Sequence, residues 1–186
     1  VSLTEAQIST LKSKGAMSEA DSLALLSEMG LPTVQSEAVE GINALKEAAK
    51  RIGYPIVLKA DVDGLHHKTE VQGVALGLAD EGALIAAHEK MQTNGLGDKR
   101  VIQTYVTEGT ELSLGVLVNP DFGAFVTLSG GGRNVELFRE RVILPAELSY
   151  SDAETAVEDK AVSRLLKGAR GFKPDAEKLA QTLHRF

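Results

Sequence analysis

The chain has 186 residues, of which 43% are apolar, so it can bury a sizeable core in one or two small lobes. Its formal net charge of −6 argues against nucleic acid as a partner, because a phosphate backbone requires a basic face. The sequence has no cysteine and no apolar run as long as a membrane span, which excludes disulfides, thiolate metal sites and a membrane partner and indicates a cytoplasmic protein.

Helices and strands alternate in the first third of the chain, after a polar lead-in over 1–17. Ser18 can cap the first helix, and glycines end the helical stretches. The predicted elements are a helix over 18–29, a strand starting at 31–34, a helix over 42–52 and a buried strand over 55–58. This order favours an α/β or α+β fold over an all-helical one.

The rest of the chain continues the alternation. The predicted elements are a glycine-containing strand over 71–78, a helix over 81–91, strands over 100–106, 111–116 and 124–128, and helices over 152–166 and from about Pro174 to His184. The segment NPDFG over 119–123 is a turn by composition, because asparagine, proline, aspartate and glycine each favour turns.

Between Tyr54 and Leu78 a strand, a lysine, two adjacent histidines and a glycine-containing strand follow one another. Lys59 at the strand end projects an ammonium over the sheet, although a solvated strand-edge lysine is the alternative. A strand, a polar loop and a second strand make a flap able to close over phosphates, with Lys59 and Lys68 as point charges.

His66 and His67 lie in that loop. A neutral imidazole is a competent phosphoryl acceptor, and neighbouring cations stabilise the phosphate that it carries. A structural or solvated histidine pair and a zinc site are the alternatives. Against zinc, the chain has no cysteine and only two other histidines. Of these, we expect His88 to be a satisfied or exposed helix residue and His184 to interact with the carbonyls of its own helix.

Three consecutive glycines follow the strand over 124–128, and Arg133 comes next. Glycines allow backbone amides to approach an anion closely, and the arginine adds a charge. A glycine run alone is most often a flexible turn, so both interpretations stay open.

The segment VLKADVDGLHHKTEVQGVALGL resembles the phosphate-loop region of the ATP-grasp domain in nucleoside-diphosphate-forming acyl-CoA synthetases. This family includes ADP-forming acetate–CoA ligase and is related to succinyl-CoA synthetase. Lys59 matches the strand lysine that contacts nucleotide phosphates, and His67 and Lys68 match the HK pair. Gln72 replaces the first glycine of the family's VGGV while Gly73 matches the second, so we expect a slightly stiffer turn.

The resemblance extends over IQTYV, ELSLGV and the glycine run, and implies a site for ATP or ADP with Mg²⁺. His67 is the implied catalytic residue, carrying a phosphoryl group between sites, and Glu136 is the implied metal ligand. The implied nucleotide-binding residues are Lys59, Lys68, Gly73, Gln103, Val106, Glu111, Gly131 and Gly132. Coenzyme A and a small-molecule acid are implied to bind a partner CoA-binding or ligase domain or subunit, within a homo- or hetero-oligomer.

The implied fold is α+β: an ATP-grasp-like domain over 18–186 with mixed or antiparallel sheets and flanking helices. Its N-terminal lobe, with the phosphate loop, covers 18–107 and its C-terminal lobe covers 108–186. The family continues into a strand-rich segment resembling ELDINPL, and this sequence stops before it, so we expect those C-terminal strands to be missing. The alternative function is therefore a non-catalytic nucleotide-binding, regulatory or assembly module of a larger protein, such as a protein acetyltransferase.

Overall fold

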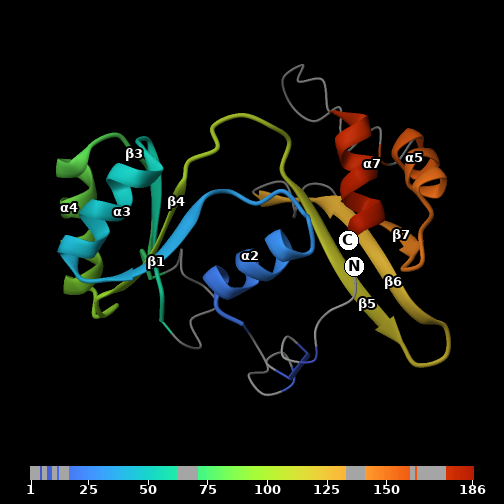
Figure 1. Ribbon diagram of the computed structural model, residues 1–186, viewed down its shortest axis with the longest axis horizontal. Coiled ribbons are helices and arrows are strands. Elements are labelled where there is room, and N and C mark those ends of the chain that lie inside the picture. Colours follow the sequence, from blue (N-terminus) through green and yellow to red (C-terminus); the bar gives the residue numbers. More distant parts are fainter. Residues whose placement is uncertain are drawn as a thin grey trace. The chain divides into compact units, whose positions relative to one another are not determined.

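A computed structural model describes residues 17–62, 71–132, 141–159 and 175–186, with the single residues 5, 8, 9, 12 and 162. The chain divides into two compact units, Val1–Val106 and Thr107–Phe186. Each unit contains an antiparallel sheet with helices packed on one of its faces (Figure 1). The predicted α+β class, with antiparallel sheets and flanking helices, is confirmed. Within these described ranges, no helix is long and apolar enough to cross a membrane.

The first unit is built on a four-stranded sheet with the strand order β1-β4-β2-β3. Its elements are α2 (Glu19–Glu28), β1 (Ser36–Glu40), α3 (Ile42–Ile52), β2 (Ile56–Ala60), β3 (Val74–Leu78), α4 (Glu81–Thr93) and β4 (Lys99–Thr104). The predicted bounds of α3 are confirmed at both ends. Gly53, at φ 84°, follows its last residue and supplies the left-handed backbone at which helices commonly stop.

The strand predicted to start at 31–34 is wrong in position, since β1 begins at Ser36. The ladder with β4 runs from Ser36 opposite Gln103 to Glu40 opposite Lys99, so the length of β4 determines where β1 starts. Pro32 has no N–H to donate to such a ladder.

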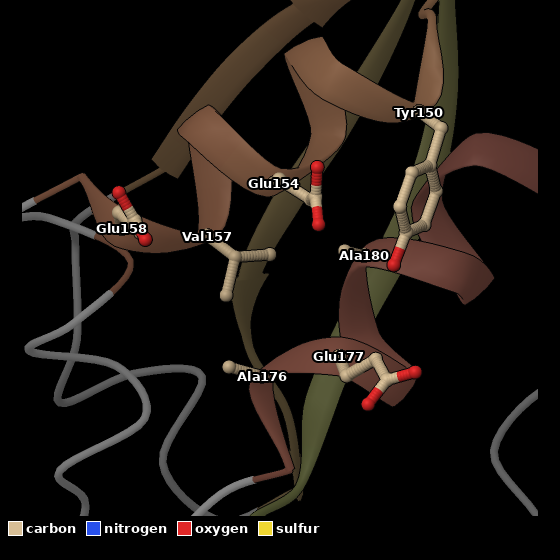
Figure 2. A pocket seen from close by; sticks show the side chains of 7 residues that line it. All are labelled: Tyr150, Glu154, Val157, Glu158, Ala176, Glu177 and Ala180. Carbon is tan, nitrogen blue, oxygen red and sulfur yellow. The ribbon is translucent and has the colours of Figure 1, made fainter.

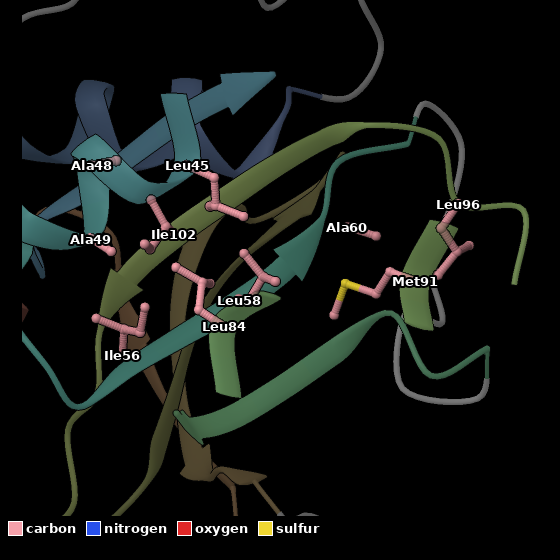
Figure 3. Close-up of a cluster of buried hydrophobic side chains, with 10 residues drawn as sticks. All are labelled: Leu45, Ala48, Ala49, Ile56, Leu58, Ala60, Leu84, Met91, Leu96 and Ile102. Carbon is pink, nitrogen blue, oxygen red and sulfur yellow. The ribbon is translucent and has the colours of Figure 1, made fainter. Parts of the chain in front are cut away.

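Alternate residues of β2 point to opposite faces of the sheet, as the strand period of two requires. The core of the unit forms between one face of the sheet and the helices α3 and α4 (Figure 3). Its buried members are Leu45, Ala48, Ala49, Ile56, Leu58, Ala60, Leu84, Met91, Leu96 and Ile102. Lys59 lies between two core residues of β2 and therefore projects from the other face.

Two polar residues, His88 on α4 and Arg100 on β4, are buried and have structural roles. The guanidinium of Arg100 donates to the carbonyls of Leu96, Gly97 and Lys99 at 2.7–3.1 Å, which holds the chain that follows α4. His88 is 2% exposed, and its Nε2 lies 3.1 Å from Asp98 Oδ1. Burial, followed by the charge of Arg100, lowers the pKa of His88. His88 is therefore buried and paired with Asp98, rather than exposed.

The second unit is built on a three-stranded sheet with the order β5-β6-β7. Its elements are β5 (Leu112–Asn119), β6 (Gly123–Gly130), β7 (Arg141–Pro145), α5 (Tyr150–Glu158) and α7 (Ala176–Arg185). The turn between β5 and β6 confirms the predicted turn. Asn119 Oδ1 accepts from the N–H groups of Asp121 at 2.9 Å and Phe122 at 3.0 Å.

Three predictions for the second unit are corrected. The helix predicted over 152–166 ends at Glu158, because Asp159 takes ψ 144° and two carboxylates there oppose the helix dipole. The last helix begins at Ala176, two residues later than predicted, and is capped by Asp175, which accepts from Lys178 N. The carbonyl at 2.9 Å from His184 Nδ1 is that of Leu148, before α5, and not one of its own helix. The strand β7 was not predicted.

Candidate functional site

Two of the predicted nucleotide-binding residues lie on neighbouring strands of the first unit. Lys59 on β2 is opposite Val101 on β4, and Gln103 on β4 is opposite Val57 on β2. Residues two apart on a strand share a face, so Lys59 and Gln103 are diagonal neighbours on the sheet face away from α3 and α4.

A single carboxylate joins these two side chains. Glu19, in the first turn of α2, forms an ion pair with Lys59, and its Oε1 also accepts from Gln103 Nε2 at 3.0 Å. The Lys59 side chain is 23% exposed and that of Glu19 is 30% exposed, whereas Gln103 is only 5% exposed. The three side chains form what we call the Glu19–Lys59–Gln103 cluster.

Sequence reasoning missed Glu19, which lies 40 residues before Lys59. Its one signal in the sequence is its position directly after the cap residue Ser18. An acidic residue there is commonly explained by the positive end of the helix dipole. Nothing local shows that its carboxylate turns toward a strand lysine, because that contact depends on how α2 packs on the sheet.

Gly73, which precedes β3, is hydrogen-bonded to the end of β2. The carbonyl of Gly73 accepts from Ala60 N at 2.8 Å, one residue beyond Lys59. Gln72 has φ 57°, in the left-handed region that favours glycine. Gln72 thus adopts a glycine-like conformation at the position where the resembling family has glycine. Val106, at the end of the first unit, is 63% exposed.

The structure brings three predicted residues of the second unit together. The N–H of Gly131 donates to the carbonyl of Glu111 at 2.8 Å, and Gly132 has φ 57°. A Cβ at Gly131 would lie 2.9 Å from the backbone carbon of Leu112, and a Cβ at Gly132 would overlap the Glu111 carboxylate. Gly131 therefore requires glycine, because the atoms in the way are backbone, whereas a side chain at Gly132 would displace the Glu111 carboxylate and adopt a left-handed φ. The glycine run is a close backbone approach to Glu111 and not merely a flexible turn.

The remaining predicted site residues, His67, Lys68 and Glu136, lie outside the described residues, as do His66 and Arg133. Within the described ranges, no group of three or more histidine or acidic side chains is placed to hold a metal ion. The described residues therefore contribute two clusters, the Glu19–Lys59–Gln103 cluster and the Glu111–Gly131–Gly132 cluster.

The two clusters differ in what they offer a ligand. An ammonium has three N–H donors, and Lys59 is partly exposed, so it can donate to phosphate oxygens while it holds Glu19. The carboxylate of Glu111 offers oxygen ligands of the kind that Mg²⁺ binds. Taken separately, the first unit thus offers lysine donors suited to phosphate oxygens, and the second unit offers a carboxylate suited to a divalent cation.

A cavity of about 310 Å³ lies elsewhere in the second unit, between α5 and α7 (Figure 2). Its lining residues are Tyr150, Glu154, Val157, Glu158, Ala176, Glu177 and Ala180. Burial and the charges of Glu154 and Glu177 raise the pKa of Tyr150. None of the predicted site residues that the structure describes lines this cavity. Its acidic walls do not suit a nucleotide, because carboxylates repel phosphates.

The chain was compared with known proteins. A family model described as an ATP-grasp domain matches residues 10–186. An ADP-forming acetate–CoA ligase I of Archaeoglobus fulgidus is 29% identical over 183 residues, which cover 94% of this chain and 27% of that protein. The beta subunit of ADP-forming acetate–CoA ligase II of Pyrococcus furiosus is 24% identical over 176 residues, 90% of this chain and 75% of that subunit.

Solved structures agree with these sequence matches. The dinucleotide forming acetyl-coenzyme A synthetase 1 of Ca. Korarchaeum cryptofilum, in complex with coenzyme A, Ca-AMPCP and HgCl⁺, superposes with a TM-score of 0.85. It is 30% identical, and the match covers 96% of this chain and 82% of that chain. A second structure of that synthetase, with coenzyme A and Mg-AMPPCP, has its phosphohistidine segment pointing towards the nucleotide binding site. Its TM-score is 0.79 at 32% identity, covering 96% and 81% of the two chains.

Proposed function

Because the chain belongs to the ATP-grasp domain family, and matches that domain in ADP-forming acyl-CoA synthetases, we propose that it binds Mg-ATP or Mg-ADP for such a synthetase. The predicted resemblance is confirmed at the level of the family. The chain spans about a quarter of the length of the longer relatives, at 24% and 27%, so the activity of a whole synthetase is part of the proposal.

The observation that carries the proposal is the Glu19–Lys59–Gln103 cluster. Three polar side chains share one face of a sheet whose other face is the apolar core. A partly buried lysine beside a strand-end loop supplies the cation that nucleotide phosphates need, since phosphoryl transfer depends mainly on positioning and charge neutralisation. Gln103 adds an amide next to it.

The second cluster supports the same assignment. Glu111 is the candidate for a magnesium–nucleotide contact, and the two glycines leave its carboxylate room against the backbone. Glu136 remains a proposed metal ligand on the strength of the sequence. When bound, Mg²⁺ would neutralise the phosphate oxygens while Lys59 and Lys68 hold them in place.

His67 is the proposed phosphoryl carrier. An imidazole nitrogen attacks the γ-phosphorus of ATP and forms a P–N bond, while the bond to the β,γ-bridging oxygen breaks and ADP leaves. The imidazole N–H proton passes to solvent. The Korarchaeum synthetase has a phosphohistidine segment pointing towards its nucleotide binding site, which supports this role for the HHK loop.

The acyl and coenzyme A half of the reaction is proposed to take place on a partner domain or subunit. One relative is a beta subunit, which supports a partner for this chain. The Korarchaeum synthetase was solved with coenzyme A, which supports coenzyme A as the thiol substrate. The acid remains a small carboxylic acid of unassigned identity.

The test measures binding of ATP and ADP by calorimetry, with and without Mg²⁺, followed by labelling with γ-labelled ATP. We expect magnesium-dependent binding and acid-labile, base-stable label on the chain. His67→Ala is expected to abolish the label and to leave nucleotide binding within about twofold, since the imidazole acts in chemistry and not in affinity. His66→Ala is the matched control and should keep the label. Full labelling of the His67→Ala protein would contradict the assignment.

A further inference from the structure

We propose that Glu19 is a positioning residue of the nucleotide site, which restrains the Lys59 ammonium and the Gln103 amide before the nucleotide arrives. This inference rests on the proposed function and extends it to a residue of another element, the helix α2. Glu19 acts through Lys59 and Gln103, and it need not touch the nucleotide.

The geometry places one acceptor between two donors. Glu19 Oε1 accepts from Gln103 Nε2 at 3.0 Å and is the same atom that pairs with Lys59 Nζ. The two donors come from adjacent strands and share a face. One carboxylate oxygen therefore fixes the relative positions of two side chains that the strands alone leave free to rotate.

Lys59 benefits most from this restraint. Its side chain has four rotatable bonds, and ordering it at the moment of binding costs conformational entropy. An ion pair that orders it in the free protein removes that cost from nucleotide binding. One N–H of the ammonium engages Glu19, and with 23% of the side chain exposed, donors remain for phosphate oxygens.

Glu19 is not the residue that caps α2. Ser18 caps α2, since its side chain accepts from Asp21 N at 3.1 Å. No residue of α2 is fully buried, although Leu23, Leu25 and Leu26 are partly buried. The polar contact between Glu19 and the strands thus also links α2 to the nucleotide site.

A carboxylate beside a phosphate-binding lysine has two opposite consequences. It orders the ammonium, which favours binding, and it repels the incoming phosphates, which disfavours binding. We infer that the ordering effect is the larger one, because Glu19 also accepts from the buried Gln103. A carboxylate that only competed with phosphate for Lys59 would not need this second contact.

The first experiment measures the Kd of ADP and of adenosine by calorimetry. For Glu19→Ala we expect about tenfold weaker ADP binding, which corresponds to about 1.4 kcal/mol. Adenosine binding should not change, because Lys59 serves the phosphates. Glu19→Asp should restore part of the affinity if its shorter carboxylate reaches the lysine. General unfolding of the site would weaken both ligands equally.

Glu47→Gln is the matched control, because Glu47 pairs with Lys50 at 2.8 Å on the same unit at an exposed surface. This variant should leave both affinities unchanged. Lys59→Met should abolish most of the phosphate-dependent affinity, and adding Glu19→Ala to it should change the Kd by less than about twofold, because coupled residues are not additive.

A second experiment does not depend on nucleotide. The rate at which an acylating reagent modifies Lys59, followed by mass spectrometry, should rise by roughly fivefold in Glu19→Ala, since a paired ammonium is less available than a free amine. Lys50 in the same sample provides the reference rate.

The outcomes separate the two proposals. If the unaltered chain binds neither ATP nor ADP, the proposed function fails, and the acylation rate still decides whether Glu19 restrains Lys59. If ADP binds but Glu19→Ala binds it equally well or more tightly, the positioning role is overturned. An unchanged acylation rate of Lys59 overturns the restraint itself.

Discussion

The two units solve the same packing problem in different ways. Each places helices on one face of an antiparallel sheet. In the first unit, the core face of β2 is covered along its length, with Ile56, Leu58 and Ala60 all fully buried. In the second unit, the β5–β6 hairpin extends beyond its helices. Val116 and Val118 share the core face of β5 but are 59% and 71% exposed.

The two units also differ in where their polar clusters lie. The first unit places its polar cluster on the sheet face opposite the core, where Glu19 of α2 meets Lys59 and Gln103, whereas the second unit places its polar cluster where the strands end, at Glu111 and the glycines. The covered strand therefore serves both the core and the site. Among the described residues, the base of the β5–β6 hairpin belongs to the core through Val126 and Leu128, whereas its tip contributes neither to the core nor to the polar cluster, and Phe122 at the turn is 78% exposed.

The largest effect should follow from truncating the covered strand. We expect Leu58→Ala to lower the free energy of unfolding by about 3 kcal/mol, because a fully buried leucine leaves a cavity. Val118→Ala in the hairpin, at 71% exposure, should change it by less than about 0.5 kcal/mol. Urea denaturation of both variants measures the two changes in the free energy of unfolding. Equal losses would mean that the hairpin is covered in solution.

A smaller effect is expected at the glycine beside Glu111. Gly132→Ala should cost about 2 kcal/mol, from left-handed strain and from overlap with the Glu111 carboxylate. Gly97→Ala is the matched control, since Gly97 has φ 61° and open space around its Cβ position. The double variant Gly132→Ala with Glu111→Ala should recover the part of the loss that is due to overlap. Thermal unfolding provides the measurement, and no recovery would refute the close approach.

The smallest effect is expected at Gln72, the counterpart of Gly132 in the first unit. Both residues have φ 57°, but only one of them is glycine. Gln72→Gly should raise the stability by about 0.5 kcal/mol, because relief of left-handed strain exceeds the added entropy of the unfolded chain. Denaturation midpoints measure the change. A destabilised Gln72→Gly protein would mean that the glutamine side chain makes a contact worth more than the strain.

Local patterns predicted most of the regular structure. The apolar spacing over 42–52 and the following glycine identify α3 at both ends, and NPDFG identifies the hairpin turn. The pattern did not identify β7, an edge strand in which Arg141, Ile143 and Pro145 are exposed, so it lacks the continuous apolar run that marks a buried strand. It also extended α5 beyond Glu158, because apolar residues recur at helical spacing after the helix has ended.

The candidate site was predicted in part. Lys59, Gln103, Glu111 and the glycines were named from the sequence, and the structure places them in two clusters. Their roles toward a nucleotide remain predictions, and His67, Lys68 and Glu136 lie outside the described residues. Glu19 was missed because its partner is 40 residues away and helix N-termini carry acidic residues for an unrelated reason.

By itself the sequence determined most of the order of helices and strands, the family and the residue types that suit a nucleotide, because these depend on local spacing and short motifs. Only the tertiary structure decided that Glu19 meets Lys59 and Gln103, and that Gly131 and Gly132 lie against Glu111. Such contacts arise from strand register and from the docking of distant elements. No local pattern encodes them, because the side chains that meet are neighbours in space and not in sequence.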